Sequence, residues 1–425
     1  MIAQVRNLLA RSHTRGNALE KTRIGFVAVL IASFVVATTA RAQNNQIATA
    51  DDTARFLAGM PLSANSPLAQ LAQDPIAKQH AAYLDSAFGN VEKIQMSKIR
   101  VWASANLSAP KPVVFYMFGG PDFLYADAFF PNATTYVLQG LEPVGQIPDL
   151  LKMPRWSALQ SLRNIQGSLR SILTVTYFIT VQMNTDLSSS GTLPILYVFL
   201  ARSGNVIHDV SLVHLDEQGV LQSGEGPRPP PPARGVKIIV SEKDGPQKTI
   251  YYFSTNLADQ RGKNIALLQF GKSLGQGDSF VKSASYLLHN ANFSQVRNFL
   301  LENSSTILQD ATGIPLRYFD PTKWQLRGFG QLMIPFQRNR PTPIEFGIGY
   351  QWRPNQSSIL LATRGTEAAE STAVVPKEAT PRQPDVVRQP IVRARPAQRT
   401  KNEPPPGQLL PFPLFPFFLF GQPQP

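Results

Sequence analysis

Two short apolar runs organise the middle of the chain. Val113–Phe118 is continuously apolar, as expected for a strand buried on both faces, and Thr134–Leu138 is a second strand-like run. The fifteen residues between them, Gly119–Ala133, are enough for a short helical crossover between neighbouring parallel strands. The sequence therefore predicts a strand, a helix and a second strand over residues 113–138.

Helical periodicity is clearest in Trp156–Ile172, where apolar residues recur at steps of three and four. Capping residues and apolar stripes predict further helices. In chain order these are Asp74–Phe88, Val91–Trp102, a helix from Asp278 or Ser279 to His289, and Ser294–Glu302.

Stretches rich in β-branched and aromatic residues predict strands. Pro194–Ala201 is expected to form a hairpin with Val206–Leu215, and Val236–Val240 is expected to form another with Thr249–Phe253. Other candidates are Thr174–Met183, Thr306–Leu308, Gly330–Phe336, Phe346–Tyr350 and Ile359–Ala362. Strands and helices that mix in this way predict an α/β (or α+β) fold, with a mixed β-sheet and flanking helices.

The start of the chain has the pattern of a secretory signal. A basic stretch ends near Arg23, a mostly apolar stretch covers residues 24–40, and Ala40-Arg41-Ala42 is a small-residue cleavage site. We expect residues 1–42 to be a signal peptide, cleaved near Ala42, and the protein to be periplasmic or secreted. The alternative is an inner-membrane protein anchored by residues 24–40, and we expect membrane contact only through this leader if it is uncleaved.

Composition divides the rest of the chain into three parts. Residues 43–110 are expected to form a helical N-terminal arm, and residues 111–364 a mixed α/β domain with a proline-rich loop at 224–234. Residues 365–425 are proline-rich and mostly polar, so we expect a disordered tail, with an apolar end at Leu409–Phe420. This tail either lies on the protein's own surface or binds an envelope protein or polymer in the extended mode of proline-rich segments.

The net charge of +13 does not indicate nucleic-acid binding. Residues 1–42 account for +5 and residues 365–425 for +2, which leaves about +6 for the body of the chain. Such a mildly basic surface is compatible with anionic envelope polymers but not with a stripe of cations that follows phosphates. The absence of cysteine excludes disulfides, thiolate metal sites and cysteine nucleophiles.

The turn after the first strand is the candidate ligand site. It lies where a strand ends and a helix begins, the usual position of ligand sites in open α/β sheets. Gly119 and Gly120 permit close backbone approach, and Phe123 and Tyr125 add aromatic surface beside the free N–H groups of a helix start. This combination would suit a sugar or an anionic ligand, although such aromatic clusters also occur simply as core.

Asp122 and Asp127 are the candidates for acid–base catalysis. Asp122 is expected in the first turn of the crossover helix, behind Pro121 at its first position, where the helix dipole alone explains an acidic residue. Asp127 follows five residues later, too far round an ideal helix to share its face. An open cleft with a second polar group beside Asp122 would favour a hydrolase, whereas an Asp122 that only caps its helix would not.

No metal or cofactor is expected. His208 and His214 lie six residues apart in one expected strand, a separation of roughly 20 Å, so they cannot share an ion. Ser279–Lys282 matches S-x-x-K but lacks the partner motifs that serine enzymes of that type need. The sequence therefore favours an exported bacterial envelope protein with a binding or structural role, and the alternative is a metal-independent hydrolase with its site at the Gly119–Asp127 loop.

Overall fold

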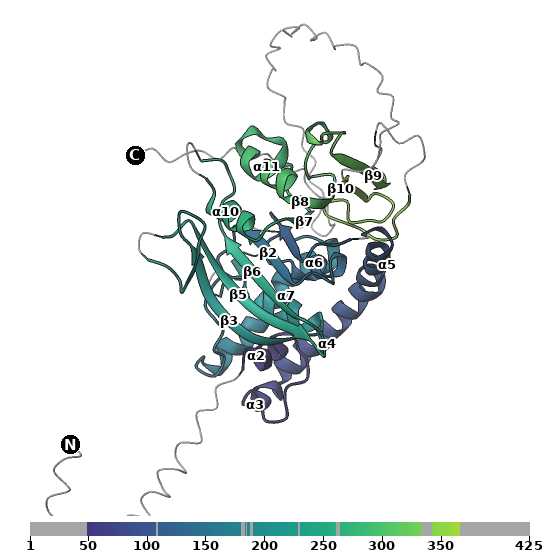
Figure 1. Cartoon of the computed structure of the whole chain (residues 1–425). Helices are drawn as coiled ribbons and strands as arrows, with labels where there is room; N and C mark the ends of the chain where they lie inside the picture. The colour runs from purple at the N-terminus through teal and green to yellow at the C-terminus, as the bar shows by residue number, and fades with distance from the viewer. Residues whose placement is uncertain are drawn as a thin grey trace, which may run out of the picture. The chain divides into compact units, whose positions relative to one another are not determined.

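Ten strands form one mixed β-sheet in the part of the chain that the structure, a computed structural model, describes (Figure 1). That part is residues 49–365 except 108, 180–182, 184, 188–189, 228–229, 261–263, 333 and 335–341. Helices cover both faces of the sheet, which confirms the expected α/β fold. The expected signal peptide at residues 1–42 and the tail beyond Gly365 lie outside the described residues.

Parallel strands form the centre of the sheet. In sheet order these are β6 (Gln247–Ser254), β2 (Thr135–Gly140), β1 (Val113–Tyr116), β7 (Gly277–Val281) and β8 (Ser304–Gln309). Helix α6 (Phe123–Phe129) joins β1 to β2. The strand, helix and strand predicted over residues 113–138 are therefore confirmed.

Antiparallel strands extend the sheet on both sides. Beyond β6 lie β5 (Ala233–Glu242), β3 (Asn205–Leu215) and β4 (Leu221–Ser223), and beyond β8 lie β10 (Ser358–Arg364) and β9 (Trp324–Gly330). The hairpin of β5 and β6 is the predicted one, and β8 and β10 contain the strands predicted at 306–308 and 359–362.

Two predicted strands near the end of the domain are wrong over their described residues. β9 already ends at Gly330, where the backbone turns with a positive φ of 70°, and the described residues between Gln331 and Ile334 form no strand. Phe346–Tyr350 contributes only an isolated bridge between Ile348 and Gln351. Close backbone approaches in this segment, such as Gly347 against the Trp352 carbonyl, favour a compact loop over an extended strand.

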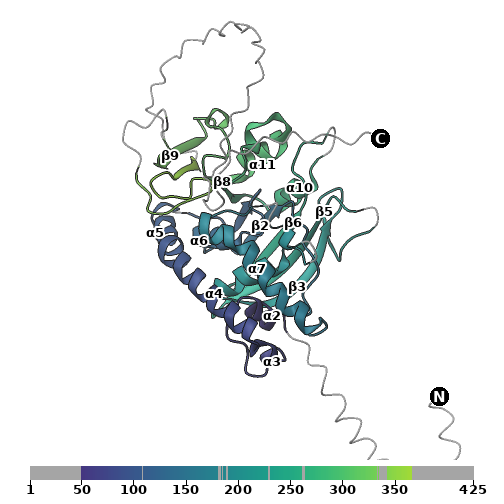
Figure 2. The same ribbon diagram turned by 180° about the vertical axis from the view of Figure 1, so that it is seen from behind.

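The helices lie in two layers, one on each face of the sheet. One face packs against α2 (Ala50–Leu57), α4 (Pro75–Val91), α5 (Ser97–Asn106), α6, α7 (Arg155–Val175) and α9 (Leu193–Arg202), and the other against α10 (Ala266–Ser273) and α11 (Ser294–Asn303). Side chains alternate along β1, so Tyr116 packs in the core beneath the first group of helices and Phe115 in the core beneath α10 and α11. Figure 2 shows α4 and α7 in front of the strands.

The predicted helical arm before β1 is confirmed over its described residues. Asp74 caps α4 by accepting from the Ile76 N–H, and Pro75 occupies the first helical position, where no N–H is needed. A π-helical segment, Glu92–Met96, joins α4 to α5, and the short helix α3 (Ala69–Ala72) precedes them. Single 3-10 turns occur at Leu287–His289, Ala291–Phe293 and Leu316–Tyr318. None of these helices combines the length and apolar character needed to cross a membrane.

The strand predicted at Pro194–Ala201 is a helix, α9. Every residue from Leu193 to Ala201 is buried, so the stretch shows no change of polarity that would distinguish a helix from a strand. Its predicted partner Val206–Leu215 is indeed a strand, but it pairs with β5 and β4. The strand predicted at Thr174–Met183 is also wrong where it is described, because α7 continues to Val175 and ends at Thr176 in a left-handed conformation.

The helix predicted from Asp278 or Ser279 to His289 is a strand, β7, followed by a turn. Asp278 does not cap a helix; its carboxylate accepts from the Lys111 N–H at 2.7 Å and the Thr306 N–H at 3.0 Å on neighbouring segments. All five residues of β7 are buried between the two helical layers. A strand that is buried on both faces has no alternation to reveal it, which explains the wrong prediction.

Phe199 tests the position of α9 in the core. Its ring is fully buried against those of Phe88 and Phe178, so Phe199→Ala should lower the free energy of unfolding by about 3–5 kcal/mol. Urea unfolding followed by circular dichroism measures this. Val101→Ala is the control, since Val101 is 71% exposed and its truncation should change the free energy by less than about 0.5 kcal/mol. Similar small effects of both variants would contradict the buried helix.

Candidate functional site

The order in which successive strands are added to the sheet reverses between the parallel central strands β1 and β7. The connection from β1 to β2 passes through α6 on one face of the sheet, whereas the connection from β7 to β8 passes through α11 on the other. In open α/β sheets, ligands bind at the carboxyl ends of strands at such a switch point. The candidate loop Gly119–Asp127 begins at this place.

Asp122 lies at the switch point in a closed environment. It caps α6, which begins at Phe123, rather than lying in the first turn behind Pro121 as predicted. Its carboxylate accepts from the Tyr125 N–H at 3.2 Å and from the Tyr116 hydroxyl at 2.8 Å. Asp122 is only 1% exposed, so its carboxylate does not face an open cleft.

Lys282 is the counter-charge of Asp122. Its Nζ lies 2.8 Å from the Asp122 carboxylate, donates to the Thr176 carbonyl at the end of α7, and sits 3.8 Å from the centre of the Tyr125 ring. Burial lowers the pKa of Lys282, and the carboxylates of Asp122 and Asp310 oppose that shift. The ammonium group thus connects the start of α6, the end of β7 and the end of α7.

The turns around this ion pair hold unusual backbone conformations. The non-glycine residues with positive φ there are Phe118, Thr176, Ser283, Ser285 and Tyr286. Asp310, which follows β8, holds one of these turns by accepting from the Ser283 N–H at 2.9 Å, and burial raises the pKa of its carboxyl. Such conformations persist only where the surroundings impose them, so the contacts around the ion pair hold these turns in place.

Asp127 belongs to a different ion pair. Its carboxylate lies 3.1 Å from the Nζ of Lys248 on β6 and accepts from the Tyr136 hydroxyl at 3.3 Å. Burial raises the pKa of Asp127, and Lys248 opposes the shift. Lys248 also contacts Glu242 at 2.8 Å, so the cluster fastens α6 to the β5–β6 hairpin. The structure therefore does not bring Asp122 and Asp127 together.

The predicted ligand-binding residues lie against other side chains. Phe123 is fully buried with its ring 5.1 Å from that of Tyr136, and Tyr125 is 1% exposed beneath Lys282. Gly119 is needed because a Cβ there would come within 2.3 Å of the Tyr116 ring, and Gly120 has a positive φ of 64°. The glycines therefore serve the packing of the turn, and the aromatic residues are core.

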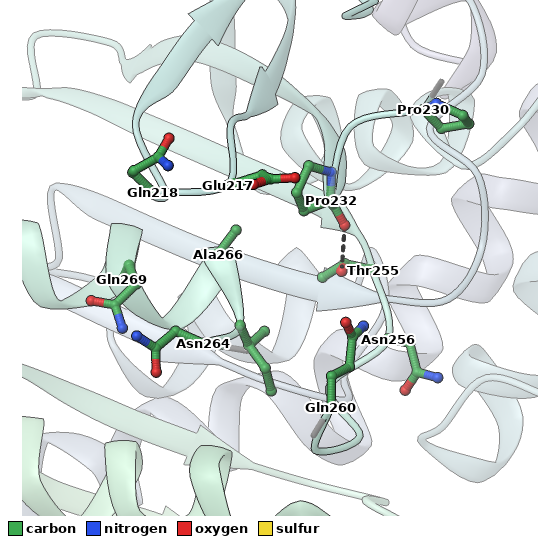
Figure 3. A pocket seen from close by; sticks show the side chains of 11 residues that line it. Glu217, Gln218, Pro230, Pro232, Thr255, Asn256, Gln260, Asn264, Ala266 and Gln269 are labelled. Carbon is green, nitrogen blue, oxygen red and sulfur yellow. Dashed lines mark hydrogen bonds between the residues drawn. The ribbon is translucent and has the colours of Figure 1, made fainter. Parts of the chain in front are cut away.

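An open cavity of about 690 Å³ lies elsewhere on the same edge of the sheet, beyond the end of β6 (Figure 3). Its lining residues come from the turn after β3, the proline-rich loop, the segment after β6 and the start of α10: Glu217, Gln218, Pro230, Pro232, Thr255, Asn256, Gln260, Asn264, Ile265, Ala266 and Gln269. We call this the amide-lined cavity. Sequence reasoning missed it, and its one signal was the proline-rich insertion at 224–234.

Five side-chain amides give the cavity its chemistry. Those of Gln218, Gln260, Asn264 and Gln269 make no hydrogen bond to other described residues, whereas Asn256 accepts from the Ala258 N–H at 2.9 Å. Figure 3 shows Gln269, Asn264 and Gln260 along one side, with Gln218, Glu217 and Pro232 opposite. Each amide carries donors and an acceptor, and among the described lining residues Glu217 is the one ionisable side chain.

A second cavity of about 350 Å³ adjoins the first and shares Pro230 with it. It is more apolar, with Val144, Leu212 and Pro231 in its lining beside Arg234. The Thr255 hydroxyl donates to the Pro232 carbonyl at 2.9 Å and so fixes the proline-rich loop to the end of β6. The loop therefore forms a wall common to both cavities.

The histidines of β3 each contact a neighbouring strand or turn. His208 lies 2.7 Å from the Ser241 hydroxyl, and His214 lies 2.9 Å from the Gly224 carbonyl. The pairing of β3 with β5 shifts register between Ile207 and Asp209, at the position of His208. Over the described residues, no group of three His, Cys, Asp or Glu side chains could hold a metal ion.

Removal of Lys282 tests the importance of the buried ion pair. Lys282→Ala leaves the Asp122 carboxylate buried without its counter-charge, so the free energy of unfolding should fall by about 3–5 kcal/mol. The double variant Asp122→Asn/Lys282→Met removes both charges and should recover part of that loss. Lys152→Ala breaks an exposed pair with Asp149 and serves as the control, with a nearly unchanged urea midpoint. Equal losses of stability in Lys282→Ala and Lys152→Ala would contradict the importance of the buried ion pair.

Comparison of the chain with protein-family models, curated proteins and solved structures found no significant match. Its function is therefore inferred from the geometry of its own residues.

Proposed function

We propose that the chain is a non-catalytic binding protein of the bacterial envelope, and that it takes a neutral, hydrogen-bonding polymer such as a glycan strand at the amide-lined cavity. The observation that carries this proposal is the described part of the lining, in which five amide side chains and one carboxylate surround about 690 Å³ of open space. That volume lies within the usual range of ligand sites. Amides pair with hydroxyl and amide groups of a ligand without requiring it to be charged.

The adjoining cavity supports a polymer over a single small molecule. Because the two cavities share Pro230, a ligand longer than one ring could lie along the proline-rich loop and occupy both. The apolar side chains of Val144 and Leu212 suit the C–H faces of sugar rings. Among the described residues that line the first cavity, Glu217 is acidic and none is Lys or Arg.

The envelope location rests on the leader. The basic stretch, the apolar residues 24–40 and the Ala40-Arg41-Ala42 site support export with cleavage near Ala42, and an uncleaved inner-membrane anchor is the alternative. The proline-rich tail over residues 365–425 is a separate proposed contact for an envelope protein or polymer.

A metal-independent hydrolase with its site at Gly119–Asp127 is the second candidate. Two observations favour it: the loop lies at the switch point, and the buried Ser283 Oγ, in a strained turn nearby, has no hydrogen-bond partner among the described residues. The closed ion pair of Asp122 with Lys282 counts against it, since acid–base chemistry needs a carboxylate that reaches the substrate. Binding at the open cavity is therefore the better-supported function.

Titration of the full chain with chitohexaose, a neutral sugar polymer that carries hydroxyl and amide groups, tests the proposal. Isothermal titration calorimetry should show saturable binding. Gln218→Ala/Gln269→Ala removes one amide from each side of the cavity and should weaken binding about tenfold, the effect of one or two lost hydrogen bonds.

The matched control is Gln160→Ala, which removes an exposed amide from α7 and should leave the affinity unchanged. Two results would contradict the proposal: absence of binding by the unaltered chain, or equal affinities of the double variant and the control.

A further inference from the structure

An unusual run of exposed residues precedes and begins α7. All six residues from Leu151 to Trp156 are exposed, and they combine apolar and cationic side chains: Leu-Lys-Met-Pro-Arg-Trp. Trp156 is 72% exposed, although tryptophan is usually among the well-buried residues. By contrast, Trp102 is 9% and Trp324 5% exposed.

The outer face of α7 continues this surface. Gln160, Arg163 and Arg170 follow Trp156 at steps of three, four or seven residues, so they share one stripe of the helix, and all three are exposed. The opposite stripe, which includes Leu162 and Leu169, is buried in the core. α7 contains three arginines and no Asp or Glu, so its outer face is cationic.

Nearby carboxylates only partly balance this charge. Lys152 pairs with Asp149 and Arg155 with Asp74, whereas Arg163 and Arg170 form no ion pair with a described residue. Asp186 approaches the helix at Gly167, and its carboxylate accepts from the Ser168 hydroxyl at 3.5 Å. α4 lies beside α7 and adds the exposed Tyr83 to the same side of the sheet (Figure 2).

We propose that Leu151–Trp156 and the outer face of α7 form a docking surface for an anionic phospholipid bilayer. Tryptophan and leucine enter the headgroup region with their apolar parts, while lysine and arginine extend toward phosphates. Arg163 and Arg170, which form no ion pair with a described residue, supply the charge complementarity for an anionic surface. A protein partner fits less well, because the core of such interfaces is poor in lysine, and Lys152 stands between the apolar side chains of Leu151 and Met153.

The surface would hold the protein close to the membrane independently of residues 24–40. It lies on helices that cover one face of the sheet, whereas the amide-lined cavity is formed by the proline-rich loop and the start of α10, which belongs to the opposite layer. Membrane docking and ligand binding therefore use different residues, and either can fail without the other.

Co-sedimentation of the full chain with vesicles of equimolar phosphatidylglycerol and phosphatidylcholine tests this proposal. Trp156→Ser/Arg163→Glu should weaken binding by about tenfold or more, because it removes the interfacial ring and reverses one charge. Trp352→Ser/Arg353→Glu is the matched control: it makes the same changes at another exposed tryptophan, 36% exposed, with an arginine beside its ring. It should bind as the unaltered chain does, and circular dichroism should show all three folded.

Tryptophan fluorescence gives a second readout that other apolar segments of the chain cannot mimic. Addition of the same vesicles should shift the emission to shorter wavelength, and Trp156→Phe should abolish most of that shift. Vesicles of phosphatidylcholine alone should bind more weakly, and added salt should weaken the anionic case. Equal sedimentation of the Trp156 and Trp352 double variants, or a full shift in Trp156→Phe, would overturn the proposal.

Discussion

Lys282 brings an ammonium group to the carboxyl edge of the sheet with only 2% of its side chain exposed, and the carboxylate 2.8 Å away on Asp122 is its counter-charge. A buried charge without a partner is strongly destabilising, so each group requires the other in place. The same Nζ also binds the last carbonyl of α7, and Asp122 caps α6. One ion pair thus fixes the positions of two helices relative to β7, and the neighbouring turns hold positive φ angles around it.

This constraint explains why the switch point is closed. The polar groups that an enzyme would direct at a substrate are bound instead to one another, with the Tyr116 hydroxyl and the Asp122 carboxylate as an example at 2.8 Å. The amide-lined cavity lies two strands away, at the end of β6, where the proline-rich loop forms one wall and four amide side chains make no hydrogen bond to other described residues. Rigid strands ending in an open loop provide a scaffold on which binding residues are displayed.

The sequence predicts those parts of the fold in which periodicity or turn chemistry is visible. β1, α6 and β2 follow from two apolar runs and their spacing, α7 from its stripe, and the β5–β6 hairpin from its turn. α9 is wholly buried, so its sequence shows no polar face that would mark it as a helix. In β7, Asp278 resembles a helix cap, but its carboxylate accepts from N–H groups of neighbouring segments that the sequence does not place beside it. The position of Asp122 at a helix start was predictable, but its partner Lys282 lies 160 residues away in the sequence. The cavity was not predictable either, because its lining comes from four separate segments, and the amides that three of them contribute carry no distinctive motif.

Hydrogen–deuterium exchange with and without chitohexaose would locate the ligand most directly, since it reports on both candidate places in one experiment. If the protein binds at the amide-lined cavity, ligand should slow exchange in residues 255–260 and 264–269 and around Gln218, and leave residues 118–125 and 282–286 unchanged. Protection confined to residues 118–125 and 282–286 would instead place the site at the Asp122–Lys282 ion pair and contradict the account.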